Sequence, residues 1–316
     1  MQKLSKKPIL IGTRGSLLAL TQAKSVAREL RKKNPGVAFK LSVIKTTGDE
    51  YQTVELFRKN NTGVFTKEIE KQLLSGKVDV AVHSLKDLPT DLPKGLVLAA
   101  FPKRLDTSDV LISKQRFDLK TLPQGACIAT GSPRRKRQLE ILRPDLEIVE
   151  IRGNLDTRVR RVLEKKEFHA VALAKAGLLR LKRYLKYAVT LSPEKILPAV
   201  GQAALGLQAR ASDKPVLKML QKLDHAPTRW LVGAERAFLK TLHGGCRVPV
   251  GIHSKISRGN IELKAFVFSM LNDRWISGAI KGPVKKYEAL GDRLAKNLLS
   301  CGAAKLLQEA REGSEK

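Results

Sequence analysis

The fold is decided by residues 8–20, Pro-Ile-Leu-Ile-Gly-Thr-Arg-Gly-Ser-Leu-Leu-Ala-Leu. Residues 8–12 form a short apolar run that predicts a buried strand. Ser16 then offers an N-cap, because its side chain can accept a hydrogen bond from the first turn of a helix. Apolar residues follow at helical spacing and predict one buried face: Leu17, Leu20, Ala23, Ala27 and Leu30. The chain therefore opens with a strand followed by an amphipathic helix.

The same alternation of strands and helices continues and then starts again. The first part has a β-rich run at 39–46, helical spacing of Phe65, Ile69 and Leu73, and a buried strand at 78–82. After a proline-containing segment, a second part covers about residues 108–196. Its predicted elements are strand 126–129, a basic helix from Pro133, strand 146–151, a helix from Thr157 and strand 170–174. Both parts predict a parallel sheet flanked by helices, with ligands beyond the carboxyl ends of the strands.

The last third of the chain has a different pattern. A helix from Pro227 leads to a Gly-Gly-Cys turn, and alternating residues at 261–268 follow the turn signal Arg258-Gly259-Asn260. A closing helix is expected at about 287–309. The predicted fold class is therefore α/β, with a small C-terminal α+β domain.

Composition limits the class of protein. With 316 residues and 42% hydrophobic content, the chain can bury cores in two or more domains and is not disordered. It has no run of 18 apolar residues, and the stretch before the first strand is too short for a signal peptide. We therefore expect a soluble cytoplasmic protein. Cys127, Cys246 and Cys301 form no metal-type pair, and we expect free thiols.

The net charge of +30, from 60 basic and 30 acidic residues, indicates an anionic partner. Nucleic acid, an anionic membrane and a small polycarboxylate all remain open, as does a basic surface without a ligand. The sequence contains no G-x-x-x-x-G-K-S/T or G-x-G-x-x-G motif, and its aromatic content is only 5%. Nucleotide and nucleic-acid binding therefore lack their usual motifs and stacking residues.

Several arginines lie where the strand rule places ligands. Guanidinium groups bind carboxylates with two hydrogen bonds, and helix N-termini at Ser16, Pro133 and Thr157 add N–H donors. The alternative for each arginine alone is a solvated or salt-bridged side chain. The arginines in question follow predicted strands: Arg14, Arg134, Arg135, Arg152 and Arg158.

Two further residues suggest chemistry. Asp87 lies just beyond a buried strand, and at about 4 Å a carboxylate attracts a cation by roughly 4 kcal/mol at an effective dielectric near 20. Cys246 follows two glycines and precedes Arg247, which favours an accessible thiolate. The alternatives are a turn-forming aspartate and a small buried cysteine. The histidines show no paired metal-ligand spacing, so we expect no metal: His83, His169, His225, His243 and His253.

Taken together, six motifs closely resemble those of porphobilinogen deaminases, in order, across nearly the whole chain. The resemblance implies three domains, with residues 1–103 and 202–222 in the first, 104–201 in the second, and 223–316 in a third that carries the cofactor cysteine. It implies that the first two are periplasmic-binding-protein-like α/β domains and that a return segment near 204–221 completes the first. The motifs are Thr13-Arg14-Gly15-Ser16, His83–Pro89, Ser132-Pro133-Arg134-Arg135, Arg152-Gly153-Asn154 with Thr157-Arg158, Pro198-Ala199-Val200-Gly201-Gln202, and Gly244-Gly245-Cys246.

The resemblance also implies a reaction of haem biosynthesis. Four porphobilinogen molecules would be joined head to tail with loss of ammonia, and water would release hydroxymethylbilane. A dipyrromethane cofactor would stay bound to Cys246 through a thioether. Asp87 would be the catalytic residue that contacts pyrrole N–H groups and stabilises the azafulvene cation. Carboxylate-binding roles fall on Arg14, Ser16, Ser84, Lys86, Thr130, Ser132, Arg134, Arg135, Arg152, Arg158 and Arg180, with Gln22 a weaker candidate. A cytoplasmic monomer that binds no membrane and no specific nucleic acid is expected.

The chain departs from the family pattern at a few positions. Thr62 stands where a loop of the Gly-Gly-Lys-Gly type usually has lysine, which puts one cofactor or substrate contact in doubt. Gly131 and Pro133 replace the commoner serine and leucine, and Ala203 stands where glycine is usual. We expect these changes to alter loop geometry without loss of chemistry. A noncatalytic anion-binding protein of the same architecture is the main rival, and Asp87 with Cys246 argues against it, because a pure binder needs neither.

Overall fold

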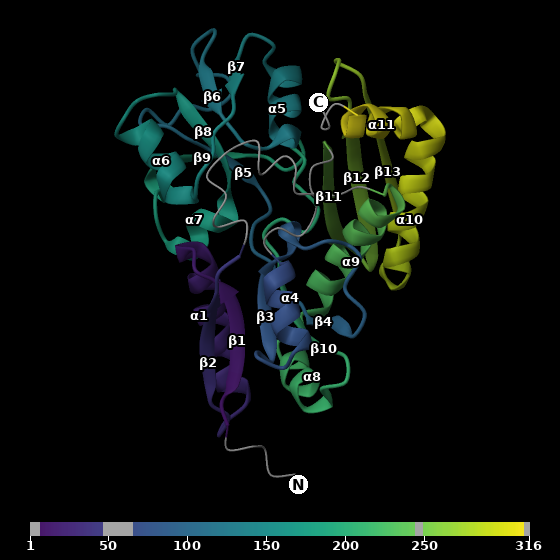
Figure 1. Cartoon of the computed structure of the whole chain (residues 1–316). Coiled ribbons are helices and arrows are strands. Elements are labelled where there is room, and N and C mark those ends of the chain that lie inside the picture. The colour runs from purple at the N-terminus through teal and green to yellow at the C-terminus, as the bar shows by residue number, and fades with distance from the viewer. Residues whose placement is uncertain (1–6, 47–65, 244–248, 313–316) are drawn as a thin grey trace. The chain divides into compact units, whose positions relative to one another are not determined.

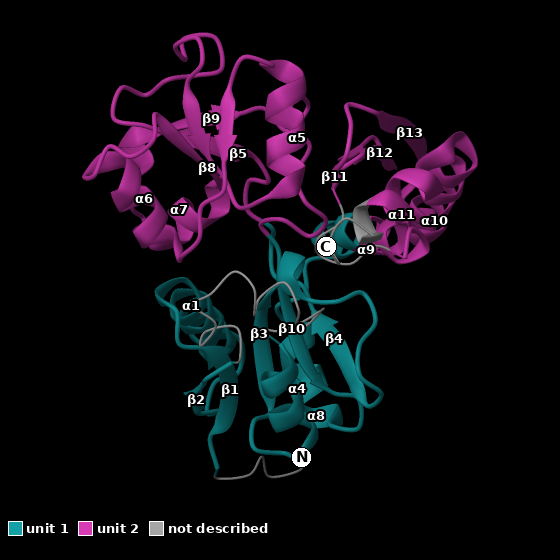
Figure 2. Ribbon diagram, turned by 45° about the horizontal axis from the view of Figure 1, so that its top comes forward, with its two compact units in different colours: residues 1–104, 204–232 teal, residues 105–203, 233–316 magenta. Residues whose placement is uncertain are grey.

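A computed structural model describes residues 7–46, 66–243 and 249–312 of the chain (Figure 1). The chain divides into two compact units (Figure 2). Unit 1 contains Met1–Arg104 and Ala204–Val232, and unit 2 contains Leu105–Ala203 and Gly233–Lys316. The described strands form three sheets, one in unit 1 and two in unit 2. The predicted fold class, α/β with a small C-terminal α+β part, is confirmed.

Unit 1 is built on a five-stranded mixed sheet. In spatial order its strands are β2 (Phe39–Ile44), β1 (Ile9–Arg14), β3 (Val80–Ser84), β10 (Leu205–Arg210) and β4 (Leu96–Ala100). Strand β1 is parallel to β2 and β3, but β10 is antiparallel to both of its neighbours. The prediction of a wholly parallel sheet is therefore wrong. The return segment near 204–221 does complete this sheet, as expected.

Helices cover both faces of the unit 1 sheet. Helix α1 (Leu17–Lys33) begins after Ser16, whose Oγ accepts a hydrogen bond from the Ala19 amide at 3.3 Å. This helix and α8 (Lys214–Gln221) contribute to one apolar cluster, which includes Val80 and Val82 of β3. Helix α4 (Lys67–Leu74) contributes to a second cluster with Ala81. Successive β3 side chains thus pack on opposite faces of the sheet, because side chains alternate between the two faces along a strand.

The first sheet of unit 2 is also mixed. Its order is β7 (Glu147–Val149), β6 (Cys127–Ala129), β8 (Ala170–Ala174), β5 (Asp109–Ile112) and β9 (Ala188–Leu191). Strand β6 is parallel to β7 and β8, whereas β5 is antiparallel to β8 and β9. The parallel prediction is wrong here too, because β5 comes first in the chain yet pairs between β8 and β9. The helices of this part are α5 (Pro133–Leu142), α6 (Leu155–Leu163) and α7 (Lys175–Leu181).

Helix α6 begins earlier than the sequence suggested. The Asn154 side chain accepts a hydrogen bond from the Thr157 amide at 2.9 Å and caps the helix, so Leu155 is its first residue. Single 3-10 turns occupy Leu85–Asp87 (η1), Leu185–Tyr187 (η2) and Val284–Lys286 (η3).

The C-terminal part of unit 2 is an antiparallel sheet with helices. Its strands are β11 (Val250–Ser257), β12 (Asn260–Phe268) and β13 (Trp275–Pro283). The two turn residues Arg258 and Gly259 have φ of 48° and 73°, as a two-residue hairpin requires. Helix α9 (Ala226–Thr241) precedes the sheet, and α10 (Tyr287–Leu298) and α11 (Ala304–Glu312) follow it. The single closing helix that we expected is interrupted at Leu299–Ala303, where Gly302 has a φ of 100°. No helix among the described residues is long and apolar enough to cross a membrane.

A glycine in α10 makes the sharpest test of this packing. A Cβ added to Gly291 would lie 2.1 Å from the Ala234 carbonyl oxygen and 3.1 Å from the Phe238 amide nitrogen, both backbone atoms of α9. Alanine would favour the helix by about 1 kcal/mol through propensity, but overpacking costs about 1–3 kcal/mol or more. We expect Gly291→Ala to lower the free energy of unfolding by about 2 kcal/mol in urea denaturation.

The matched control is Asn297→Ala, an exposed position on the same helix, which should leave stability equal or slightly higher. Equal stability of Gly291→Ala and wild type would mean that α9 and α10 do not meet at this glycine.

Candidate active site

A small pocket lies at the carboxyl ends of two parallel strands of unit 1. Because β1 and β3 are neighbours, Arg14 at the end of β1 and Ser84 at the end of β3 reach the same edge of the sheet. The cavity measures about 90 Å³, and its lining includes Arg14, Ser16, Gln22, Ser84 and Asp87. The structure therefore brings together five side chains that the sequence singled out from three separate segments.

The polar groups of this pocket are held in different ways. Gln22 is almost fully buried on α1, and its Nε2 lies 2.9 Å from the Ser84 hydroxyl oxygen. Asp87 ends the short helix η1 and is exposed to solvent. Lys86 precedes it, is half-buried, and does not line the pocket. The arrangement combines a solvent-accessible carboxylate with a nearby guanidinium and hydroxyl groups.

The other predicted ligand-binding residues lie in unit 2. Ser132 caps α5, and its hydroxyl accepts a hydrogen bond from the Arg135 amide at 3.4 Å, while Thr130 Oγ1 accepts one from the Ser132 amide at 3.3 Å. Arg158 Nε donates to the Gly153 carbonyl oxygen at 2.7 Å. The half-exposed Arg152 pairs with Glu150 at 2.5 Å. These contacts keep the loops after β6 and β7 close to their arginines.

A backbone carbonyl group holds the guanidinium group of Arg180 in place. Its Nη2 donates to the Ala203 carbonyl oxygen at 2.7 Å, and burial lowers the pKa of Arg180 to about 10, so the guanidinium stays charged at neutral pH. Ala203 itself has a φ of 68°, in the left-handed region that favours glycine. This conformation gives a physical reason why glycine suits this position.

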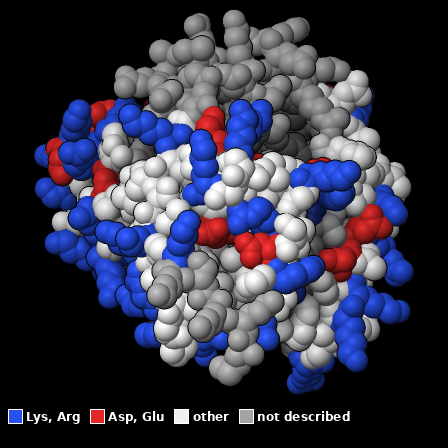
Figure 3. Space-filling view, turned by 60° about the horizontal axis from the view of Figure 1, so that its bottom comes forward, with Lys and Arg blue, Asp and Glu red and all other residues white. Residues whose placement is uncertain are grey.

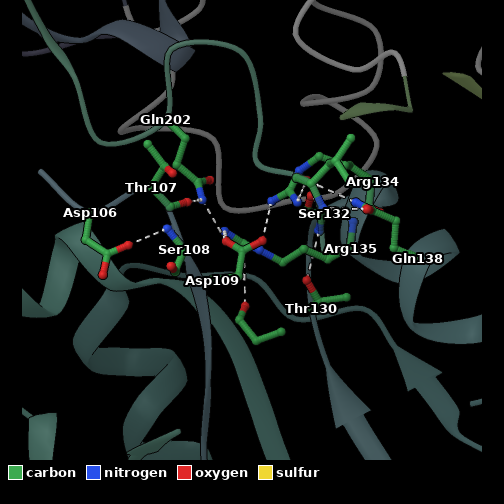
Figure 4. A network of polar contacts seen from close by, with 12 residues as sticks. Asp106, Thr107, Ser108, Asp109, Thr130, Ser132, Arg134, Arg135, Gln138 and Gln202 are labelled. Carbon is green, nitrogen blue, oxygen red and sulfur yellow. Dashed lines mark hydrogen bonds and ion pairs between the residues drawn. The ribbon is translucent and has the colours of Figure 1, made fainter. Parts of the chain in front are cut away.

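Arg134 and Arg135 differ from the expected picture of exposed ligand contacts. Both are nearly buried and share one carboxylate, that of Asp109 at the start of β5 (Figure 4). Arg134 Nη2 lies 2.7 Å from Asp109 Oδ2, and Arg135 Nη2 lies 2.8 Å from Oδ1. Burial alone would raise the pKa of Asp109, but the two guanidinium groups more than offset it and hold that pKa far below its ordinary value.

Sequence reasoning missed Asp109. The available signal was an acidic residue beginning the apolar run Asp109-Val-Leu-Ile, a position where an unpaired charge is costly. Its partners lie 25 and 26 residues further along the chain, so local patterns do not reveal the pairing.

Cys246 and Thr62 lie outside the described residues. At Gly131, a Cβ would lie 2.8 Å from the Ile151 carbonyl oxygen, so the serine that the family commonly has would require this loop to shift. Glycine here therefore fits the altered loop geometry that we expected.

Comparison with known proteins identifies the family of this chain. A family model described as "Porphobilinogen deaminase, dipyromethane cofactor binding domain" matches residues 9–218, and "Porphobilinogen deaminase, C-terminal domain" matches residues 230–300. The chain belongs to the porphobilinogen deaminase family. It is 44% identical over 309 residues to a porphobilinogen deaminase of Desulforudis audaxviator. This match covers 98% of this chain and 100% of the relative. It is 44% identical over 310 residues to one of Chloroherpeton thalassium, covering 97% of this chain and 98% of that relative.

Among solved structures, an ancestral cationic amino acid solute binding protein matches with a TM-score of 0.42 and 13% sequence identity. The match covers 68% of this chain and 87% of that one.

The residues of unit 2 fit the cofactor that the family model names. Dipyrromethane carries carboxylate side chains, which need cationic or N–H donors. The Nε atoms of Arg134 and Arg135 are buried and make no hydrogen bond to any described residue. Thr130 and Ser132 add hydroxyl groups beside this arginine pair (Figure 4). The Arg134 and Arg135 Nε groups are therefore buried donors of a kind that suits a ligand carboxylate.

A buried polar chain supports the wall of the Asp87 pocket. Gln208 on β10 donates through Nε2 to Glu70 Oε1 at 2.9 Å, so its Oε1 accepts from His83 Nε2 at 2.9 Å. His83 lines the pocket, and burial lowers its pKa to about 4 despite the opposing hydrogen bond to Gln208. Burial raises the pKa of Glu70. Both groups therefore favour their neutral forms more than they would in water.

The pKa of His83 predicts a pH dependence of stability. The unfolded histidine takes up a proton below about pH 6.5, but the folded one does so only near pH 4, so stability falls as pH drops through this window. The difference of about 2.5 between these pKa values corresponds to about 3 kcal/mol when the window has been crossed. Urea denaturation at pH 7 and pH 4.5 should show most of this loss in wild type and a smaller one in His83→Gln. Glu70 acts in the opposite direction in both proteins, so the comparison isolates His83. Parallel losses in the two proteins would contradict the assignment.

The loop at Gly131 supplies a second test. Because the nearest atom to an added Cβ is a backbone oxygen, Gly131→Ala should lower the free energy of unfolding by about 1–3 kcal/mol. Gly15→Ala is the control, since its Cβ would meet only the Val43 side chain at 3.4 Å. Thermal denaturation of both variants would settle the point, and equal melting temperatures would show that the Gly131 loop moves without cost.

Proposed function

We propose that this chain is an active porphobilinogen deaminase that joins four porphobilinogen molecules to hydroxymethylbilane in tetrapyrrole biosynthesis, and that Asp87 is its catalytic residue. The observation that carries the proposal is the pocket in which the Asp87 carboxylate and the Arg14 guanidinium share one edge of the unit 1 sheet. A porphobilinogen molecule is a cationic amine with anionic carboxylates, and this pocket offers a partner for each charge.

Asp87 suits the step that releases ammonia. The bond between carbon and the amino nitrogen breaks with its electron pair on nitrogen, and the pyrrole ring keeps a positive charge. A carboxylate about 4 Å from that charge stabilises it by roughly 4 kcal/mol at an effective dielectric near 20. The same oxygen atoms accept hydrogen bonds from pyrrole N–H groups. Since Asp87 is exposed at the end of η1, its side chain is accessible to a substrate.

The acetate and propionate groups of the substrate and cofactor need cationic partners. In unit 1 we assign Arg14, Ser16, Ser84 and Lys86 to this task, with Gln22 holding the Ser84 hydroxyl in place. In unit 2 the hydroxyl groups of Thr130 and Ser132 act with a set of arginines. These arginines are Arg134, Arg135, Arg152, Arg158 and Arg180.

The proposed cofactor is dipyrromethane, bound by a thioether to Cys246. The family model of the C-terminal domain spans this residue, and Gly244-Gly245-Cys246 supplies the motif. When bound, the cofactor supplies the pyrrole to which the first substrate is joined. The other two cysteines are poorer candidates, because burial raises the pKa of Cys127 and the exposed Cys301 lies in the helix break of the C-terminal part.

We further propose a monomeric cytoplasmic enzyme of three domains, 1–103 with 202–222, 104–201 and 223–316. Each of these ranges contains all the strands of one sheet, which supports the division. On the face drawn in Figure 3, lysine and arginine side chains are scattered, with small acidic groups between them.

Variants of Asp87 and Cys246 test the two assigned roles separately. Asp87→Ala should keep the mass of a covalent dipyrromethane adduct but lower kcat by about 10²–10⁴-fold, because a charge-stabilising carboxylate is lost. Cys246→Ser should lack the adduct and give no colour with an acidic aldehyde reagent for pyrroles. Intact mass spectrometry and steady-state kinetics measure both effects.

Asp91→Ala, an exposed change four residues beyond Asp87, is the control and should retain the adduct and the wild-type rate. Near-normal turnover by Asp87→Ala, or an adduct on Cys246→Ser, would overturn the corresponding role.

A further inference from the structure

The motif Pro198–Gln202 has no part in the proposed mechanism, yet its last residue contacts the carboxylate that the two arginines of unit 2 share. Gln202 Nε2 donates to Asp109 Oδ1 at 2.9 Å and to the Thr107 carbonyl oxygen at 2.6 Å. Gly201, in the same motif, donates its amide to Glu235 Oε2 at 2.7 Å. Asp109 is fully buried, and its carboxylate accepts hydrogen bonds from three side chains, those of Arg134, Arg135 and Gln202 (Figure 4).

Backbone carbonyl groups fix the same two guanidinium groups from other sides. Arg134 Nη1 donates to the Leu197 carbonyl oxygen at 2.5 Å, and Arg135 Nη1 donates to that of Ala172 at 3.2 Å. Gln138 holds Leu197 in turn, because its Oε1 accepts from the Leu197 amide at 2.7 Å. Each guanidinium therefore has two nitrogen atoms held by protein, and its Nε remains unbound by any described residue.

The charges of this cluster do not balance. Within the described residues, Asp109 is the one carboxylate in ion-pair contact with Arg134 or Arg135. The neighbouring Asp106 instead pairs with Lys175 at 2.7 Å and accepts from the Ser108 amide at 2.8 Å. One carboxylate against two guanidinium groups leaves a net positive charge in a buried place, where an uncompensated charge is costly. A ligand carboxylate would remove that cost.

We infer that Asp109 is a positioning residue for cofactor loading, and that Gln202 of the Pro198–Gln202 motif holds its carboxylate in place. Asp109 holds Arg134 and Arg135 in place beside Thr130 and Ser132, so that the pair can receive one ligand carboxylate. This inference rests on the proposed function, since the ligand is the dipyrromethane or its precursor porphobilinogen.

The alternative is that Asp109 serves only to offset charge in the core of unit 2. The two roles predict opposite results for Asp109→Asn, which keeps the size of the side chain but removes its charge. If Asp109 only offsets charge, its loss makes the arginine pair more positive, and an anionic ligand should bind at least as well. If Asp109 positions the pair, loading should slow in spite of the greater positive charge.

The experiment mixes purified apo-protein with porphobilinogen and follows by intact mass spectrometry the fraction of chains that gain the covalent adduct. We expect Asp109→Asn to load at least about tenfold more slowly than wild type, by analogy with outer-shell partners of bound ligands. Gln202→Leu, which removes the hydrogen bonds to Asp109 and to the Thr107 carbonyl oxygen but leaves every buried charge in place, should slow loading by a smaller factor. Asp106→Asn is the matched control and should load at the wild-type rate.

Gln202→Leu keeps the test decisive if Asp109→Asn does not fold, because it leaves both arginines and the Asp109 charge in place. Its melting temperature should show that it folds, while its loading stays slower than that of wild type. Wild-type loading by folded Asp109→Asn, or by folded Gln202→Leu, overturns the inference alone. Absence of any adduct on wild type, under conditions that leave it folded, overturns the proposed function and this inference with it.

Discussion

One buried carboxylate holds three segments of unit 2 together. Asp109 joins the start of β5 to the first turn of α5 through two arginines, and to the end of the Pro198–Gln202 segment through an amide. Such a charge is tolerated in a core only because every partner is present, so the surrounding backbone has little freedom to move. The segment before β5, the loop after β6 and the segment before residue 203 are therefore parts of one rigid arrangement.

Asp87 and Asp109 show how environment assigns different tasks to the same side chain. Asp109 is enclosed and paired twice, which keeps it charged and fixed, whereas Asp87 ends a short exposed turn beside an arginine. The first can hold other residues in place, and the second can respond to charge that develops on a substrate. In the function proposed above, both residues serve one ligand that carries positive and negative groups together.

Local features of this structure could be predicted from sequence, and long-range pairing could not. The β1–α1 unit and its Ser16 cap depend on neighbouring residues, so spacing and residue type were sufficient. The direction of β10 depends on β3, whose Ser84 pairs with Leu205 more than a hundred residues later, and no local pattern records it. Asp109 and the contact of His83 with Gln208 were missed for the same reason. In the site, Arg14 ends β1 and Asp87 lies three residues beyond β3, so the strand rule pointed to both, whereas Ser84 came from the family resemblance. The residues that support them show no local signal of this kind.

The place of β10 in the unit 1 sheet has a consequence for the order of events on the ribosome. This strand lies between β3 and β4, yet it is made only after all of Leu105–Ala203 has been synthesised. Until then β3 and β4 have no strand between them, and their backbone N–H and C=O groups lack these ladder partners. The N-terminal sheet must therefore wait for the second α/β sheet to emerge, which reverses the usual sequence in which the first domain made is the first to fold. In this chain the growing polypeptide carries an incomplete sheet through a third of its synthesis, a period in which unpaired edges are open to aggregation or to chaperones.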